Sequence, residues 1–350
     1  IAIDPTDPRI RTLLAEANAA TRRALEREGT PAARLSVLLR NWSIEAAWLV
    51  ENLEPQPAER LLGELESQWN RLAESSPQDF DIQEELAPAL AMRARVLLVL
   101  GKEEASEMAS KQVIEIREAV AKRYPDDEGA RAAVAEARLL LADNFVTRFR
   151  YREALAELDR CVAIGAPALA RSPDSLEHRV RLAFCEAKRV MAYVDWRRLK
   201  TDLDLAPART SLARATELIG EISDSDIEDP RIALNIGQVR FACGQMAEID
   251  GDHLGALDHY GRAIALLEFD RRVKFDRAST DMPMHVVRRA AGRVFMRLDR
   301  HAEAESHLQA ALDVEMGVRN IEPTYRGSTH RLRETLFQIA LTRGFLGRAD

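Results

Sequence analysis

The feature that most constrains this chain is a pattern of a small, a large and a small residue that returns along the sequence. Ala256, Tyr260 and Ala263 form the clearest copy, with spacings of four and three residues. Residues at these spacings share one face of a helix, so each copy indicates a helix that packs through a fixed contact. The first residues of successive copies are 47, 49, 54, 48 and 48 residues apart, which predicts a repeat architecture. The other copies are Ala58, Leu62 and Leu65; Ala105, Ala109 and Gln112; Ala154, Leu158 and Cys161; Ala208, Leu212 and Ala215; and Ala304, Leu308 and Ala311.

Each of the last two copies is preceded by a glycine and then by a turn. Gly244 and Gly292 are these glycines, and Gly251 and Asp299 lie in the turns. The series resembles the tetratricopeptide repeat (TPR), in which small residues stand where two helices cross and a large residue stands between them. Ala247 departs from the family, which usually has a tyrosine there. The resemblance implies an all-α chain, a TPR-like α-solenoid of about six antiparallel helix pairs in a right-handed superhelix.

Prolines mark the breaks between the expected helix pairs. Pro77, Pro125 and Pro173 are 48 residues apart. Asp229 followed by Pro230 predicts a helix start, because aspartate caps a helix and proline fits its first position. The wider spacing of 54 residues indicates an insertion at about 197–205, either a plain loop or a contact element that interrupts the binding surface. We expect helix pairs at 31–75, 79–123, 128–171, 175–221, 230–270 and 283–319, a capping helix at 8–28 within residues 1–30, repeats over 31–320, and a second capping helix at 324–346 within residues 321–350.

Charge and composition restrict the kind of partner. The chain has 50 basic and 57 acidic residues, and the net charge of −7 argues against a nucleic-acid binder. No apolar run approaches the roughly 20 residues needed to cross a bilayer, so no membrane insertion is predicted. Cys161, Cys185 and Cys243 are far apart and form no metal-ligand spacing, which suits a reducing, cytoplasmic location. No motif predicts a cofactor or a metal ion.

No catalytic motif is found, so we expect a chain that is not an enzyme. It lacks a glycine-rich nucleotide loop, the HRD and DFG segments of kinases, a G-x-S-x-G elbow and an HExxH pair. The segment 117–127 and the long period resemble the TPR tracts that follow the kinase domain in planctomycete-type bacterial Ser/Thr kinases. This resemblance implies that a catalytic domain lies outside the chain. Because the sequence begins at Ile1 without a methionine, we expect a piece of a longer protein.

One constellation predicts a binding surface. Arg289, Arg293 and Arg297 recur every four residues on one face of an expected first helix. The TPR resemblance implies that first helices line a concave groove, to which the preceding repeat would offer Gln238, Phe241 and Gln245. Guanidinium groups form paired hydrogen bonds with carboxylates, so an acidic protein or peptide is the expected partner. The alternative is a solvated basic face balanced by Glu303 and Glu305 on the next helix.

Three other questions stay open at this point. The helical faces could instead pair with a second copy, which would make the chain an oligomerising or regulatory arm. A pocket around Phe184, Tyr193 and Phe241 would make it a small-molecule sensor. The tryptophans of the first repeat serve either core packing or partner anchoring, since tryptophan is enriched at binding hot spots. These tryptophans are Trp42, Trp48 and Trp69.

Overall fold

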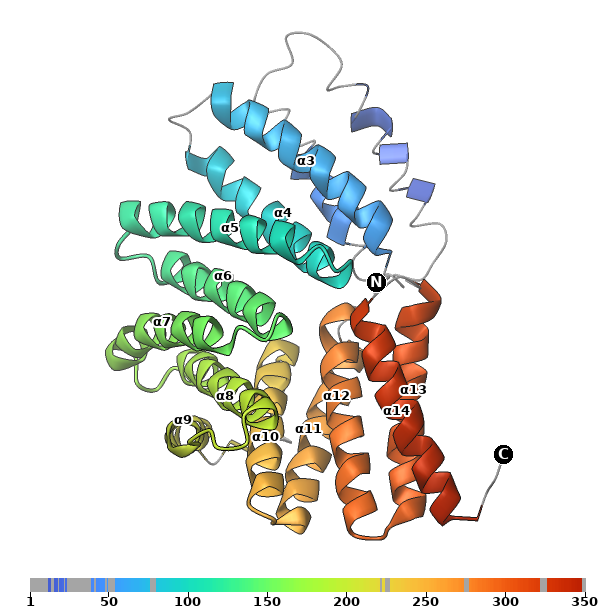
Figure 1. Cartoon of the computed structure of the whole chain (residues 1–350). Coiled ribbons are helices and arrows are strands. Elements are labelled where there is room, and N and C mark those ends of the chain that lie inside the picture. Colours follow the sequence, from blue (N-terminus) through green and yellow to red (C-terminus); the bar gives the residue numbers. More distant parts are fainter. Residues whose placement is uncertain are drawn as a thin grey trace. The chain divides into compact units, whose positions relative to one another are not determined.

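The computed structural model describes residues 54–75, 80–220, 222–223, 227–273, 277–321 and 326–347, with scattered positions between 12 and 49 (Figure 1). These residues form helices and turns, and no strand occurs among them. The expected leading helix at 8–28 and most of residues 31–53 lie outside the continuously described ranges. The chain divides into two units, Ile1–Asn144 and Phe145–Asp350, which are taken separately below.

In the first unit, α3 packs against α4 and α4 against α5. Trp69 on α3 is fully buried and Trp42 is 2% exposed, which assigns both to core packing, whereas Trp48 lies outside the described residues. The helices are α3 (Pro55–Ser75), α4 (Phe80–Val99), α5 (Glu103–Arg123) and α6 (Glu128–Thr147), the last of which runs into the second unit.

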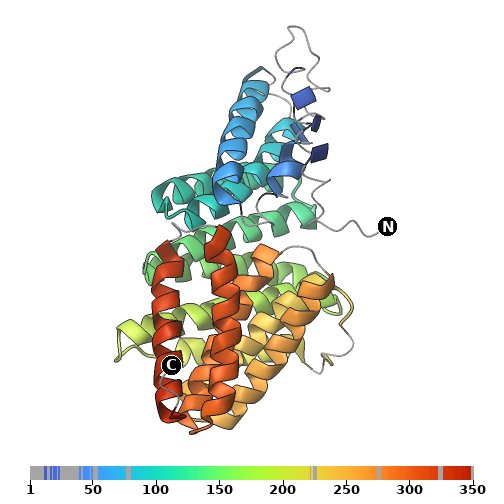
Figure 2. The same ribbon diagram turned by 90° about the vertical axis from the view of Figure 1, so that its right-hand side faces the viewer.

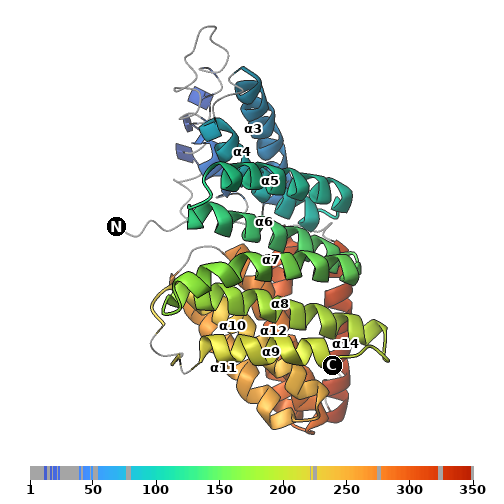
Figure 3. The ribbon, with the colours of Figure 1, turned by 90° about the vertical axis from the view of Figure 1, so that its left-hand side faces the viewer.

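In the second unit, consecutive helices form antiparallel pairs, and the first helices α8, α10, α12 and α14 also neighbour one another. Figure 3 shows α7, α8 and α9 stacked in order, and Figure 2 shows α13 and α14 side by side. The second unit therefore has an all-α fold of stacked helix pairs. Its helices are α7 (Tyr151–Arg171), α8 (Leu176–Leu199), α9 (Ala206–Ile219), α10 (Pro230–Ile249), α11 (His253–Val273), α12 (Arg277–Arg297), α13 (His301–Ile321) and α14 (Arg326–Phe345).

The predicted contact between small and large residues is confirmed in the last two complete pairs. A Cβ atom built on Gly244 of α10 would lie 2.4 Å from Cε1 of Tyr260 on α11. A Cβ atom built on Gly292 of α12 would lie 2.7 Å from Cγ of Leu308 on α13. Tyr260 and Leu308 are both fully buried. Only glycine lets the two helices approach this closely, which is the packing that the TPR-like pattern predicts.

In α5 the spacings of four and three residues recur among buried residues, but one residue later than predicted and without the large middle residue. Ala105 and Gln112 are exposed and Ala109 is 4% exposed, whereas Ser106, Ser110 and Val113 are 1%, 0% and 2% exposed. The predicted register in this helix is therefore wrong. With Ser106 as the first residue, the spacings on either side become 48 residues (106 − 58 and 154 − 106).

Serine takes the first two of these buried positions of α5, where its hydroxyl group finds backbone partners. Ser106 Oγ donates a hydrogen bond of 2.7 Å to the carbonyl oxygen of Ala94 on α4. Ser110 Oγ donates one of 2.8 Å to the carbonyl oxygen of Ser106. A buried hydroxyl group without such a partner would cost about 1–3 kcal/mol, so these bonds make serine acceptable where alanine is expected.

The turns that follow most of the described first helices also follow the repeat. A residue with positive φ follows α4, α6, α10, α12 and α14, at Gly101 (70°), Phe149 (59°), Gly251 (81°), Asp299 (57°) and Gly347 (69°), whereas α8 ends at Lys200 with a φ of −125°. These residues are 48, 102, 48 and 48 apart, and 102 equals one spacing of 48 and one of 54. This left-handed conformation satisfies the last carbonyl groups of a helix and reverses the chain. Gly347 shows that α14 ends in the same way as α10 and α12 before it.

The helix starts agree with the proline pattern in part. Asp229 Oδ1 accepts a hydrogen bond of 2.7 Å from the backbone N–H of Arg231, so the predicted cap before Pro230 is confirmed. Pro125 and Pro173 lie between pairs, while Pro77 lies outside the described residues. The predicted start at Pro283 is wrong, because α12 already begins at Arg277.

The wider spacing of 54 residues comes from a longer first helix and a loop. α8 has 24 residues and extends to Leu199. Its last turns carry Trp196, which stacks on Tyr151 of α7 with ring centroids 6.2 Å apart. Asp204 Oδ1 accepts a hydrogen bond of 2.9 Å from the N–H of Ala206, at the start of α9. The insertion therefore extends the packing of α8 on α7 and then returns the chain to α9.

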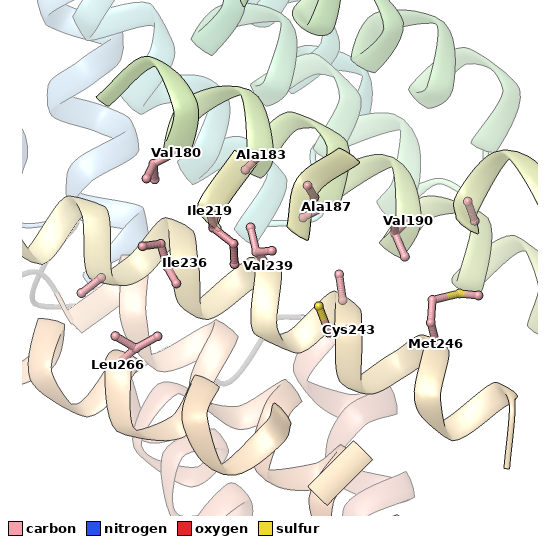
Figure 4. Packing of buried hydrophobic residues seen from close by; sticks show 14 of the residues in the cluster. Val180, Ala183, Ala187, Val190, Ile219, Ile236, Val239, Cys243, Met246 and Leu266 are labelled. Carbon is pink, nitrogen blue, oxygen red and sulfur yellow. The ribbon is translucent and has the colours of Figure 1, made fainter. Parts of the chain in front are cut away.

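The core of the second unit lies between α8, α9 and α10 (Figure 4). Val180 and Ala183 of α8 face Ile236 and Val239 of α10, and Ile219 of α9 packs against both helices. Each of these side chains is at most 1% exposed. Full burial of a valine or isoleucine contributes about 1.5–3 kcal/mol, so this cluster holds the first helices in register with one another.

Candidate functional site

The arginine row of α12 is bound to carboxylates of the two neighbouring first helices. Arg293 donates from Nε and Nη2 to Glu248 of α10, at 3.2 and 3.0 Å. Arg297 Nη1 lies 3.1 Å from Glu248 Oε1, and Arg289 donates to Glu334 of α14. The exposed fractions of the side chains of Arg289, Arg293 and Arg297 are 13%, 22% and 49%. The row thus begins nearly buried and ends half exposed.

Glu248 is the centre of this network. Its side chain is only 8% exposed, and its Oε2 accepts a hydrogen bond of 3.0 Å from the hydroxyl group of Tyr260. Burial acts to raise the pKa of Glu248, but the hydrogen bonds from Arg293 and Tyr260 and the charges of Arg293 and Arg297 bring that pKa below its usual value. Burial and the charge of Glu248 raise the pKa of Tyr260, so its hydroxyl group stays protonated and donates. Glu248 is therefore an ionised acceptor with three donors.

α8 adds charges that the sequence pattern does not reveal. Asp195 accepts a hydrogen bond of 2.7 Å from Arg198. Desolvation by the surrounding protein raises the pKa of Asp195, although its side chain is 34% exposed. The positive charges of Arg198, Arg289, Arg293 and Lys188 oppose this rise in the pKa. The charge of Arg198 also lowers the pKa of Arg289, after burial as the main cause. The cations of α8 and α12 are thus close enough to act on one another.

Two arginines of this cluster keep about half of their side-chain surface. The cluster joins cations of α8 and α12 to three carboxylates, from α8, α10 and α14. The side chains of Arg198 and Arg297 are 47% and 49% exposed. Since Arg297 contacts Glu248 through Nη1, its other N–H groups are directed elsewhere and can reach an anion. We call this cluster of Lys188, Asp195, Arg198, Glu248, Arg289, Arg293, Arg297 and Glu334 the arginine cluster.

The three residues predicted on α10 differ in their placement. Phe241 is 5% exposed and packs on Tyr260, with ring centroids 5.7 Å apart. Gln245 is 3% exposed, and its Oε1 atom has no hydrogen-bond partner within the described part of the chain. Gln238 is partly exposed. Phe241 and Gln245 therefore lie in the interior, and Gln238 alone of the three reaches the surface.

The alternative, in which Glu303 and Glu305 balance the charge of the arginine row, names the wrong carboxylates. Glu303 accepts a hydrogen bond from Arg300, and Glu305 accepts one from Arg343 of α14. The carboxylates that bind the arginine row come instead from the adjacent first helices. The first helices α10, α12 and α14 are neighbours in space, although a second helix separates each from the next along the chain. The order of the helices in the sequence therefore does not reveal these ion pairs.

The sequence does contain a signal for these carboxylates. Arg293 and Glu248 are 45 residues apart, and Arg289 and Glu334 are also 45 residues apart. This separation is three residues less than the period of 48 residues. The two side chains therefore lie on adjacent first helices, at repeat positions that differ by three residues, or nearly one helical turn. Asp195 and Arg198 carry no such signal, because the insertion after α8 shifts their place in the repeat.

The aromatic residues considered for a ligand pocket do not come together in one cluster. Tyr193 packs against the core of α8, α9 and α10, whereas Phe241 belongs to the cluster of α10, α11 and α12. Phe184 lies under the ammonium group of Lys188, 5.5 Å from Nζ to the ring centroid. The arrangement therefore gives no support to an enclosed ligand around these three rings.

Two other kinds of site, a metal centre and a membrane span, are not found among the described residues. No group of three histidine, cysteine, aspartate or glutamate side chains within these ranges is arranged to hold a metal ion. None of the described helices is both long enough and apolar enough to cross a membrane.

Comparisons with known proteins give structural likenesses only. No family model matches the sequence, and no curated protein matches it. BtubC from P. vanneervenii is 13% identical over 76% of this chain and 92% of its own, with a TM-score of 0.48. The STAND protein with a tetratricopeptide repeat sensor from Pyrococcus horikoshii is 15% identical over 90% of this chain and 44% of its own, with a TM-score of 0.45. A Rap protein in complex with Competence and Sporulation Factor is 14% identical over 95% of this chain and 88% of its own, with a TM-score of 0.43.

These scores are below the level that chains of one fold reach. The TPR-like assignment therefore depends on the small-to-large contacts and the period of 48 residues described above.

Proposed function

We propose that the chain binds an acidic protein or peptide through the arginine cluster on its first helices, and that it does so without catalysis. The observation that carries this proposal is that Arg198 and Arg297 stay about half exposed beside the more deeply buried Arg289 and Arg293. Arg289 and Arg293 are held in place by Glu334 and Glu248. Arginine that is fixed in this way loses little conformational entropy when it binds a carboxylate, which favours recognition over a mobile basic surface.

The cluster combines a rigid part with an accessible part. Arg293 and Glu248 are nearly buried and stabilise the packing of α10 against α12. Arg198 and Arg297 keep about half of their surface and can exchange water for the carboxylates of a partner. Charge-assisted hydrogen bonds of this kind contribute about 1.5–3 kcal/mol each when they are well shielded. Two such arginines suffice for a weak, salt-sensitive interaction.

The first experiment uses a fluorescein-labelled peptide of alternating glutamate and serine, followed by fluorescence anisotropy. The chain with Arg198→Gln and Arg297→Gln is compared with a control that loses two exposed lysines of α5, Lys111→Gln and Lys122→Gln. Both variants change the net charge equally. We expect about a tenfold loss of affinity in the arginine variant and little change in the lysine variant. Added salt should weaken binding to the unchanged protein, because exposed charge pairs are screened.

Two results would contradict the proposal. One is equal loss of affinity in the arginine and lysine variants, which would show that only net charge matters. The other is equal binding of a lysine–serine peptide. Charge reversal at Arg289 and Arg293 is a poor test, because it would leave Glu248 and Glu334 facing new negative charges and destabilise the fold.

A finer proposal concerns the parent protein. The resemblance of segment 117–127 to tracts in bacterial Ser/Thr kinases supports the idea that this chain serves a larger protein whose catalytic domain lies elsewhere. Under this proposal the arginine cluster would recruit a substrate or regulator for that domain. Sequencing of the full gene tests it directly, and a reading frame without a kinase domain would reject it.

A further inference from the structure

The row of residues on α14 that corresponds to the arginine row of α12 is apolar and exposed. Phe337, Leu341 and Phe345 follow Arg289, Arg293 and Arg297 by 48 residues each. Their exposed fractions are 63%, 42% and 67%. A helix that caps a solenoid presents a polar outer face, so this row differs from what the predicted capping role of α14 requires.

The apolar row lies beside the arginine row on the same side of the helix layer. α14 is a neighbour of α12, and Arg289 of α12 binds Glu334, which is one turn before Phe337 on α14. At the other end, Phe345 stacks on His301, the first residue of α13 and four residues after Arg297, with ring centroids 4.7 Å apart. Contacts at both ends therefore fix the two rows side by side. Neighbouring helices are about 8–10 Å apart, and an incoming helix is about 10–12 Å wide, so one helix can cover both rows.

From this arrangement we propose that the partner is an acidic amphipathic helix. Its apolar stripe packs on Phe337, Leu341 and Phe345, and the acidic flank beside that stripe binds the half-exposed arginines of the arginine cluster. Charge complementarity selects this occupant, because Arg198 and Arg297 each contact one carboxylate and a purely apolar helix would offer no acceptor to their remaining N–H groups. The proposal rests on the proposed function and adds the chemistry of the partner to it.

The lengths of the rows fit such a partner. Each row spans positions i, i+4 and i+8, or about 12 Å along the axis at 1.5 Å per residue. A helix with apolar residues at i, i+4 and i+7 presents a stripe of nearly the same length. Recognition of this kind, with an amphipathic helix laid on a helical surface, needs an apolar row for affinity and charged flanks for orientation.

The test uses three labelled peptides of roughly 15 residues, long enough to form a helix on binding. The first has leucines on one helical stripe and glutamates on the flank beside it. The second has the same residues in scrambled order, and the third replaces every leucine by serine. We measure anisotropy with the unchanged chain and with the variant Phe337→Ser, Leu341→Ser and Phe345→Ser. Leu254→Ser on α11, where the leucine is 68% exposed, is the matched control.

We expect the amphipathic peptide to bind at least about tenfold more tightly than the scrambled one. The triple variant should lose about 10- to 100-fold in affinity for the amphipathic peptide while its affinity for the leucine-free peptide stays unchanged. Leu254→Ser should change neither. Because all three replaced side chains are exposed, the fold should survive, and circular dichroism of the variant checks this.

The possible failures are distinguishable. Unchanged binding of the amphipathic peptide to the triple variant would overturn this inference and leave the proposed function standing. Absence of binding by all three peptides would overturn both. If light scattering shows a dimer of the unchanged chain that the triple variant loses, the apolar row is an interface between two copies, and the inference is also wrong.

Discussion

Replacement of Gly244 by alanine tests the packing on which the fold assignment depends. The new Cβ atom would lie 2.4 Å from Cε1 and 2.5 Å from Cδ1 of Tyr260. The ring cannot move aside easily, because Tyr260 is fully buried and its hydroxyl group is bound to Glu248. Overpacking of a core costs about 1–3 kcal/mol, and this contact belongs at the upper end. Alanine regains about 0.5–1 kcal/mol over glycine inside a helix, so we expect a net loss of about 2 kcal/mol.

Gly261→Ala is the matched control in the neighbouring helix. A Cβ atom at Gly261 meets nothing within 4 Å, so this change should stabilise the chain by about 0.5–1 kcal/mol. Thermal and urea unfolding followed by circular dichroism would compare the midpoints of the two variants, since repeat arrays do not always unfold in two states. Opposite shifts are expected. A Gly244→Ala variant as stable as the unchanged chain would refute the reasoning, because the helix crossing would then not require glycine.

Other outcomes follow from single sites. Ser106→Leu should cost about 1–3 kcal/mol while Ala105→Leu changes stability by no more than about 0.5 kcal/mol, and the reverse order in urea unfolding would restore the sequence-based register. Since Glu248 has a pKa below its usual value of 4.5, its contribution to stability is complete above pH 4.5 and is lost as the pH falls through that lower pKa. Glu248→Gln should remove this part of the dependence of stability on acid pH. An unchanged dependence of the unfolding free energy on pH in this variant would contradict the role of Glu248. Arg293→Met should cost about 3–5 kcal/mol by leaving Glu248 buried without its main partner, with a smaller cost in the Glu248→Gln background; equal costs in both backgrounds would exclude coupling. Burial raises the pKa of the Cys243 thiol to about 11, so iodoacetamide should label it at pH 8 only after unfolding, and rapid labelling of the native chain would show that the α10 core opens.

The sequence determined the helix pairs because their signals are local. Small and large residues three and four apart share a helix face whatever the rest of the chain does, and Asp229 caps its own helix. The predicted pair at 230–270 is accordingly found as Pro230–Ile249 and His253–Val273. The same reasoning missed the register of α5, since Ser106 takes a small position only when a carbonyl group of the preceding helix accepts its hydroxyl proton.

Tertiary structure decided which charges meet. The sequence placed Arg289, Arg293 and Arg297 on one face, because a spacing of four residues is a property of a single helix. The carboxylates that bind these arginines, Glu248 and Glu334, come from α10 and α14 and are 45 residues away along the chain. The cations that repel these arginines come from α8, which is farther away in the sequence. Their approach depends on how the first helices stack, and this stacking is set by burial between neighbouring pairs, which no local spacing encodes.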